Sequence, residues 1–272
     1  AVQRGVRMRF FHGRGRTVSR GAGPALRFLE SLPPASLTGD FRVTEQGETI
    51  AQKFANQITA TYHLELTLAG VTATTLKHRR ELDDHRELDP IVEDLAKRSR
   101  KAYVDLVRAP GFIHYFSEAT PIDAFEEANI GSRPARRTAK PHQRQLEDLR
   151  AIPWVLSWNQ SRHYIPGWYG AGTALEGLLR EDEATFDRLA KSRHPFFHYV
   201  INNIESSVAS ADEDMITLYA SLVEDQEVRE RFLARILDEM HRTRLMIERL
   251  HGSLSLAERR PRMWRTLALR AE

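Results

Sequence analysis

Apolar residues recur at helical spacing along most of the chain, and this pattern predicts a mainly helical protein. One apolar stripe follows Pro195 as far as Val208, and a second runs through residues 228–247. A third predicted helix covers residues 48–76, with a break near Asn56. Each stripe is typical of a helix that buries one face against the rest of the protein.

A fourth helix is predicted to begin within the sequence Leu88-Asp89-Pro90-Ile91. Aspartate is a favourable N-cap, because its side chain accepts hydrogen bonds from the first backbone N–H groups of a helix. Proline is tolerated at the first helical position, where a backbone N–H would have no partner within the helix. The apolar face of this helix continues to Leu106.

Few segments have the pattern of a β-strand. Short candidates lie at residues 6–11 and 41–44, with a weaker one at residues 151–154. Strands separated by long helices suggest βα units rather than a sandwich. Three strands are too few to close an eight-stranded barrel. The predicted fold class is therefore mainly α with a few short parallel strands.

Amino-acid composition excludes several classes of protein. The 272 residues are 41% hydrophobic and 28% charged, which argues against disorder and allows a substantial core. The absence of cysteine excludes disulfides, thiolate metal sites and a cysteine nucleophile. No apolar run reaches the length of about 20 residues that a bilayer span needs, and the first residues do not resemble a signal peptide. We therefore expect a cytoplasmic protein without membrane contact, and the missing initiator methionine suggests a fragment.

Glycine and arginine are concentrated in FHGRGRTVSRGAGP, residues 11–24. Glycines allow backbone N–H groups to approach an anion closely, and guanidinium groups bind phosphate or carboxylate with two hydrogen bonds. The segment is not a Walker loop, because no Gly-Lys-Ser/Thr follows at the required spacing. A specific anion site and a flexible loop with nonspecific nucleic-acid affinity remain equally open at this point, although the net charge of +3 favours anionic ligands.

Two further arginines are candidates for ligand binding. Each lies near a proline, where a predicted loop meets a helix or strand. These are Arg133 in GSRPARR and Arg150 in LRAIPW. Rigid backbone at such a place can direct a guanidinium group towards a ligand, whereas most surface arginines are simply solvated.

Other candidate residues are interpreted as structural. Glu45, after the predicted strand 41–44, could ligate a metal or act as a base, but capping a helix or pairing with an arginine is favoured. His194 and His198 have the spacing of a helical metal pair, yet Pro195 intervenes and no glutamate follows His194. We expect structural roles for both histidines.

Taken together, the motifs resemble the C-terminal part of phosphoenolpyruvate carboxylases of the bacterial type. The match rests on four blocks in family order, with a fifth similar segment at residues 51–76, and spans residues 7–224. The blocks are FHGRGRTVSRGAGP (11–24), FRVTEQGE (41–48), GSRPARR (131–137) and LRAIPWVLSWNQSR (149–162), the last continuing into PGWYGAGTAL (166–175).

The resemblance implies a helix-rich (β/α)8 barrel with its active site at the C-terminal ends of the strands. It also implies a reaction of phosphoenolpyruvate with bicarbonate that yields oxaloacetate and phosphate through carboxyphosphate and an enolate. The metal would be Mg²⁺ or Mn²⁺. Residues 1–175 would hold the last barrel strands and active-site loops, and residues 176–272 a C-terminal helical region. The complete enzyme is expected to be a cytoplasmic homo-oligomer.

Site residues follow from the matched motifs. Arg14, Arg133 and Arg150 would bind the substrate phosphate. Arg20 would lie on a glycine-rich loop that closes over bicarbonate and carboxyphosphate, and His12 would help to hold bicarbonate and carbon dioxide. The family binds the inhibitor aspartate partly through a lysine in a late helix, and Ser210 replaces that lysine here.

The chain differs from the family pattern in its glycine-rich loop and in the segments that it contains. Arg16, Ser19 and Ala22 stand where the family loop often has glycine. The catalytic His-Pro-Thr-Glu segment and the two metal-binding carboxylates of the family would lie upstream of this chain. The chain therefore corresponds to a C-terminal fragment with half of an active site, and we expect it to be inactive alone. The alternatives are a non-catalytic anion-binding or helical interaction protein derived from this barrel, and a basic nucleic-acid binder.

Overall fold

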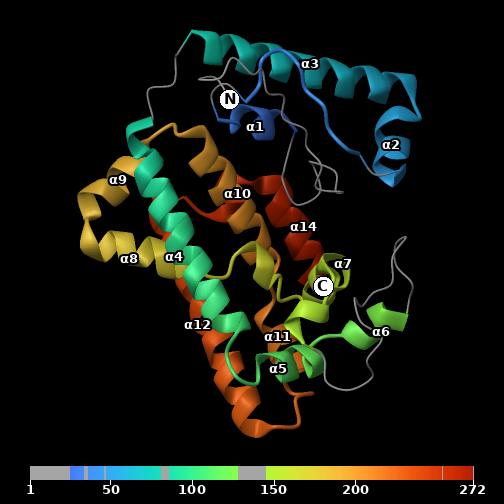
Figure 1. Cartoon of the computed structure of the whole chain (residues 1–272), viewed down its shortest axis with the longest axis vertical. Coiled ribbons are helices and arrows are strands. Elements are labelled where there is room, and N and C mark those ends of the chain that lie inside the picture. Colours follow the sequence, from blue (N-terminus) through green and yellow to red (C-terminus); the bar gives the residue numbers. More distant parts are fainter. Residues whose placement is uncertain are drawn as a thin grey trace, which may run out of the picture. The chain divides into compact units, whose positions relative to one another are not determined.

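The computed structural model describes residues 25–33, 36–45, 47–80, 86–127, 145–252 and 254–271 (Figure 1). These residues are mainly helical, as predicted. Their α-helices are α1 (Ala25–Glu30), α2 (Gly47–Phe54), α3 (Gln57–Arg79), α4 (Asp89–Val107), α5 (Phe112–Glu118), α6 (Ile122–Glu127), α7 (Ala151–Gln160), α8 (Ala171–Glu181), α9 (Glu183–Lys191), α10 (Pro195–Ser210), α11 (Glu213–Ala220), α12 (Gln226–Leu250), α13 (Leu256–Arg259) and α14 (Pro261–Ala271). Short 3₁₀ helices are η2 (Arg86–Leu88), η3 (Leu146–Asp148) and η4 (Ile165–Gly167).

The four long predicted helices are confirmed as α2 with α3, α4, α10 and α12. The break near Asn56 is a helix boundary, because Asn56 is the N-cap of α3. Its side-chain oxygen accepts hydrogen bonds from the backbone N–H groups of Ile58 at 2.9 Å and Thr59 at 3.4 Å. Asparagine at this position satisfies donors that the helix itself cannot. Helix α4 begins at Asp89, where the Asp-Pro pair predicted it.

The strand predictions have three different outcomes. Residues 6–11 lie outside the described part of the chain, and in residues 41–44 only Val43 forms a single bridge. The prediction of a strand at residues 151–154 is wrong, because these residues form the first turn of α7. Pro153 fits there, since the first N–H groups of a helix have no intrahelical partner to lose. In the described residues the predicted parallel strands are not observed.

The chain divides into two compact units, each described here by itself. Unit 1 contains Ala1–Pro90 and Ser192–Asn203, and unit 2 contains Ile91–Lys191 and Ile204–Glu272. In unit 1, α1 packs against α3 around buried Leu29, Leu37 and Val71. Gly70 of α3 makes this packing close, because a Cβ there would lie 2.8 Å from Leu29 Cδ1.

Aromatic residues fill the core of unit 2. Trp158 of α7 and Phe116 of α5 are fully buried, with ring centroids 5.0 Å apart. Phe112 of α5 lies 5.6 Å from Phe232 of α12 in an edge-to-face arrangement, which favours the ring quadrupoles. The core therefore fixes α5, α7 and α12 against one another. None of the helices in the described residues is long and apolar enough to cross a membrane.

Helices α8 and α12 lie side by side in unit 2 (Figure 1). Their approach is so close that a Cβ on Gly172 would lie 2.5 Å from the backbone nitrogen of Thr243. Gly170, the N-cap of α8, has a φ of +92°, and a Cβ there would lie 2.4 Å from the carbonyl oxygen of Ser99. Close packing thus requires glycine at both Gly170 and Gly172.

Candidate active site

Of the five residues assigned to the site from sequence, the structure describes one. His12, Arg14, Arg20 and Arg133 lie outside the described residues, whereas Arg150 lies in unit 2 between η3 and α7. The convergence of the three arginines around a phosphate therefore stays a prediction.

Arg150 is the N-cap residue of α7. Its backbone is extended, with φ −95° and ψ 150°, and its carbonyl accepts a hydrogen bond from the N–H of Trp154 at 3.0 Å. The side chain is half-buried, and its Nε is buried without a hydrogen-bond partner among the described residues. A buried guanidinium nitrogen that lacks an acceptor is unusual in proteins and is a donor available to a ligand.

The start of α7 is electrostatically suited to an anion. The helix has no side-chain cap and no acidic residue in its first turn. Backbone N–H groups at a helix N-terminus carry partial positive charge and favour phosphate or carboxylate groups. The guanidinium group of Arg150 adds a full positive charge at the same end of the helix.

Aromatic packing holds this end of α7 in place. The ring centroid of Trp154 lies 4.6 Å from that of Phe116 and 5.6 Å from that of Trp158. Trp154 also hydrogen-bonds Tyr103 of α4, whose pKa is raised by burial. Because Trp154 belongs to the first turn, these contacts fix the backbone that carries Arg150.

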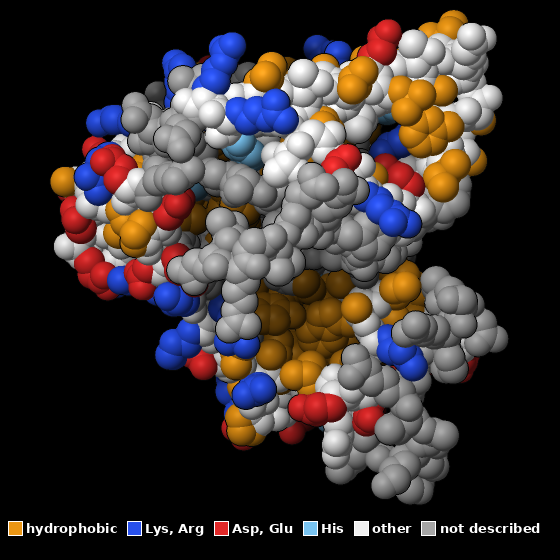
Figure 2. Space-filling view, turned by 45° about the horizontal axis from the view of Figure 1, so that its top comes forward, with side chains coloured by type: hydrophobic (Ala, Val, Ile, Leu, Met, Phe, Trp, Pro, Cys, Tyr) orange, Lys and Arg blue, Asp and Glu red, His pale blue; other side chains and the backbone are white. Residues whose placement is uncertain are grey.

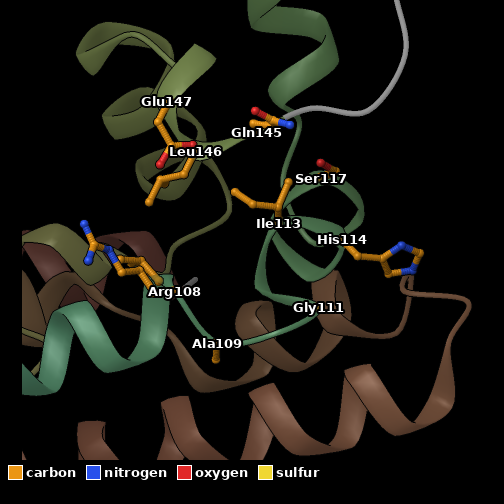
Figure 3. Close-up of a pocket in the computed structure, with 10 residues that line it drawn as sticks. Arg108, Ala109, Gly111, Ile113, His114, Ser117, Gln145, Leu146 and Glu147 are labelled. Carbon is orange, nitrogen blue, oxygen red and sulfur yellow. The ribbon is translucent and has the colours of Figure 1, made fainter.

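A cavity of about 680 Å³ lies elsewhere in unit 2, between the end of α4, α5 and η3. In Figure 3, Ile113 extends towards the side of the cavity where Leu146 lies, while His114 points away from both. Arg108 and Glu147 bring opposite charges to its lining, and Arg150 is not among the lining residues. Arg150 therefore does not contribute to this cavity.

Glu45 has the structural role that was favoured from sequence. Its Oε1 lies 2.7 Å from Lys53 Nζ in a mostly buried ion pair, so its partner is a lysine of α2 rather than an arginine. Its Oε2 is buried, and none of the described residues forms a hydrogen bond with it.

The two histidines also have structural partners. His194 Nδ1 accepts a hydrogen bond from the N–H of Phe197 at 3.2 Å, which places the proton on Nε2, 2.9 Å from Asp89 Oδ1. His198 Nε2 donates to the carbonyl of Ser192 at 2.6 Å. Within the described ranges, no group of three or more histidine and acidic side chains could hold a metal ion.

Comparison with known proteins extends the sequence match. The pattern of the family described as phosphoenolpyruvate carboxylase matches residues 1–272, beyond the expected limits of 7–224. A phosphoenolpyruvate carboxylase of Methylorubrum extorquens is 42% identical over 262 residues, which cover 94% of this chain and 28% of that protein. The enzyme of Corynebacterium glutamicum is 39% identical over 272 residues (98% and 29%), and that of Mycobacterium avium 38% over 275 residues (98% and 29%).

The chain thus spans less than a third of the length of these relatives. A match over all 272 residues, with the motif that carries Arg150 at the start of a helix, is decisive for the family. This chain belongs to the phosphoenolpyruvate carboxylase family.

Proposed function

We propose that this chain supplies the C-terminal part of a phosphoenolpyruvate carboxylase, the enzyme that forms oxaloacetate and phosphate from phosphoenolpyruvate and bicarbonate. The family match over the whole chain supports this function. The single structural observation that supports it most is Arg150 at the N-terminus of α7, whose buried Nε finds no acceptor in the part of the chain that the structure describes.

Arg150 would bind the phosphate group of the substrate together with Arg14 and Arg133. A phosphoryl group in transfer needs fixed positive donors rather than a covalent partner from the protein. The aromatic packing around Trp154 supports this role, because a donor held in place before the reaction loses little free energy in reorganisation.

The remaining assignments belong to the bicarbonate half of the reaction. His12 would hold bicarbonate and the carbon dioxide released from it, and Arg20 would close over carboxyphosphate. Exclusion of water by such closure would protect an intermediate that hydrolyses readily. These residues lie outside the described part of the chain, so the assignments rest on their motifs.

Mg²⁺ or Mn²⁺, when bound, would stabilise the developing negative charge of the enolate. The described residues provide no ligand set for it, and the proposal expects its ligands upstream of this chain. The proposal also includes a cytoplasmic homo-oligomer, with active-site loops in residues 1–175 and a helical region in residues 176–272.

The test uses a chimera in which this chain replaces the matching 262 residues of the Methylorubrum extorquens enzyme. In that chimera, Arg150→Ala should lower kcat/KM for phosphoenolpyruvate by about 10²–10³-fold, as expected for loss of one fixed donor. The kcat/KM of Arg150→Lys should lie between those of Arg150→Ala and the unmodified chimera. Lysine keeps the positive charge but loses the planar guanidinium group that forms two hydrogen bonds.

Arg108→Ala removes an exposed arginine at the end of α4 and serves as the matched control. It should leave kcat/KM within about twofold of the unmodified chimera. Near-normal carboxylation by Arg150→Ala would contradict the assignment. A well-folded chimera without any carboxylation would instead favour the non-catalytic alternative.

A further inference from the structure

Helix α3 presents an apolar face to solvent. Its large exposed side chains are Ile58 at 82%, Leu68 at 68%, Tyr62 at 60%, Leu64 at 59% and Leu76 at 46%. We call this surface the outer face of α3. At 100° per residue these positions fall on one half of the helix.

Almost no charge interrupts this face. In the fully described stretch from Ile58 to Leu76, Glu65 is the one exposed residue that carries a charge. The solvent side of α4 differs, because most of its exposed residues are charged, including Glu93, Lys97 and Lys101. A helix whose exposed half resembles a core surface is normally covered by another element.

The opposite half of α3 already has its partner. Gly70 and Val71 are buried there, and Gly70 lies against Leu26 and Leu29 of α1. Thr74 and Thr75 of α3 are buried as well, whereas the outer face is exposed. Ile50 and Phe54 of α2 extend the exposed patch, and Figure 2 shows hydrophobic side chains gathered at the α2–α3 end, at the upper right.

We propose that the outer face of α3 is the docking surface for the part of a phosphoenolpyruvate carboxylase polypeptide that this chain does not match. The matched relatives are more than three times as long as the matched region, so a large additional polypeptide accompanies this segment in each of them. A face with a single charge requires an apolar partner surface.

Two other occupants are less well suited. Residues 1–24 of this chain contain six arginines, five glycines and no acidic residue, which is a poor composition for covering a mainly apolar face. A second copy of the chain would bind in competition with a covalently linked surface. A linked surface has an effective concentration of about millimolar or more, and therefore wins that competition.

The experiment compares one double variant in two settings. Ile58→Lys with Leu68→Lys places two charges on the outer face, at exposed positions where lysine is a good helix former. In the isolated 272-residue chain, we expect the melting temperature to change by less than about 2 °C. In the chimera with the Methylorubrum extorquens enzyme, we expect it to fall by more than about 5 °C, because the charges become buried without partners.

Leu245→Lys on α12 is the matched control, since Leu245 is 57% exposed and lies beside exposed Arg244 and Glu248. It should leave the melting temperature unchanged in both the isolated chain and the chimera. If the chimera does not fold, the isolated chain is mixed with the complementary part of the relative, and binding is measured by analytical ultracentrifugation. There the double variant should bind at least about tenfold more weakly than the unmodified chain.

Three results would overturn the proposal. Equal destabilisation of the isolated chain would show that its own residues cover the face. No effect in either setting, or no binding of the complementary part, would show that the face stays in water. Dimerisation of the isolated chain that the double variant abolishes would identify a second copy as the partner. The proposal rests on family membership and not on the proposed function, and oxaloacetate formation by the chimera tests the latter separately.

Discussion

Ser210 stands where the family resemblance places a lysine that binds the inhibitor aspartate. In the structure, its Oγ donates to the carbonyl of Ser206 at 2.8 Å, so this short neutral side chain bonds within α10. Nearby in sequence to the C-terminus, Arg259 forms an ion pair with buried Glu205, which also contacts Arg260. These interactions leave the region poorly equipped to hold a second carboxylate.

We predict that aspartate at about 1–10 mM does not inhibit the active chimera. A lost charge-assisted contact is worth about 1.5–3 kcal/mol, or roughly 10–100-fold in affinity. Ser210→Lys should restore measurable inhibition in a steady-state assay, and Ser206→Ala serves as the neighbouring control. Strong inhibition of the unmodified chimera would contradict the prediction.

His163 is buried, and its hydrogen bonds determine which ring nitrogen carries the hydrogen. Ser161 Oγ donates to the carbonyl of Ser157, so both Ser161 oxygens near His163 Nδ1 act as acceptors, and Nδ1 carries the hydrogen. Nε2 is left to accept from the hydroxyl of Tyr115 at 3.4 Å. Burial lowers the pKa of His163 to about 3, and it raises the pKa of Tyr115. His163 is therefore neutral in the folded protein.

This gives a prediction for the stability of the isolated chain against pH. Unfolded His163 binds a proton below about pH 6.5, whereas folded His163 does so only near pH 3, so stability falls as the pH drops through that interval. Between pH 7 and about pH 5.5, the free energy of unfolding should decrease by about 1 kcal/mol from this residue. Urea titrations of the unmodified chain and of His163→Asn at the two pH values measure this decrease. The decrease due to His163 should be absent in the variant. Exposed His241→Gln is the control, and identical pH dependence in the chain and His163→Asn would refute the assignment.

Among elements, the junction of α8 and α12 depends on one buried carboxylate. Glu239 of α12 accepts hydrogen bonds from the N–H groups of Gly170 at 3.0 Å and Thr173 at 2.9 Å. Its other oxygen accepts from Thr173 Oγ1 at 2.5 Å and from Arg242 at 2.6 Å. Glu239 thus caps α8 from a neighbouring helix, at the end where negative charge is favourable.

Glu239→Gln keeps the shape but loses the charge and two acceptor positions. We predict a loss of about 1.5–3 kcal/mol in the free energy of unfolding, measured by urea denaturation. Glu248→Gln, at an exposed position of the same helix, should change it by less than about 0.5 kcal/mol. Equal stabilities of the two variants would show that the cap contributes little.

The sequence predicted elements better than it predicted contacts between them. Long stripes such as the one in α12 identified helices, and Asn56 and Asp89 identified boundaries, because capping depends on adjacent residues. Residues 151–154 were misassigned because a short apolar run suits a buried strand and a buried helix equally. Glu239 was missed because its partners lie nearly 70 positions away, where local pattern carries no signal.

For the whole molecule, we predict that the isolated 272-residue chain forms no oxaloacetate. The family's metal carboxylates and catalytic His-Pro-Thr-Glu segment are expected in the part of the relatives that this chain does not match. Without them, the enolate charge lacks its main stabiliser. A coupled oxaloacetate assay should read background for the chain alone, with the active chimera as positive control. Turnover by the chain itself would show that the fragment interpretation is wrong.

The family could be identified from sequence because its motifs are local blocks, such as the one that contains Arg150. The geometry of the site could not be obtained in this way. Convergence of Arg14, Arg133 and Arg150 depends on long-range packing, and the structure describes Arg150 alone among them. The burial of Arg150 Nε, away from any acceptor in the described ranges, and the aromatic support from Trp154 emerge only in three dimensions.

The apolar outer face of α3, with the covering surface proposed for it, has a consequence for biosynthesis. Ribosomes add about 5–20 residues per second, and domains fold as they emerge. In a polypeptide that carries this segment at its C-terminal end, the covering surface is synthesised before α3 leaves the ribosome. The apolar side chains of the helix then meet a folded surface of their own chain within seconds. The order of synthesis would protect this helix from aggregation with other nascent chains.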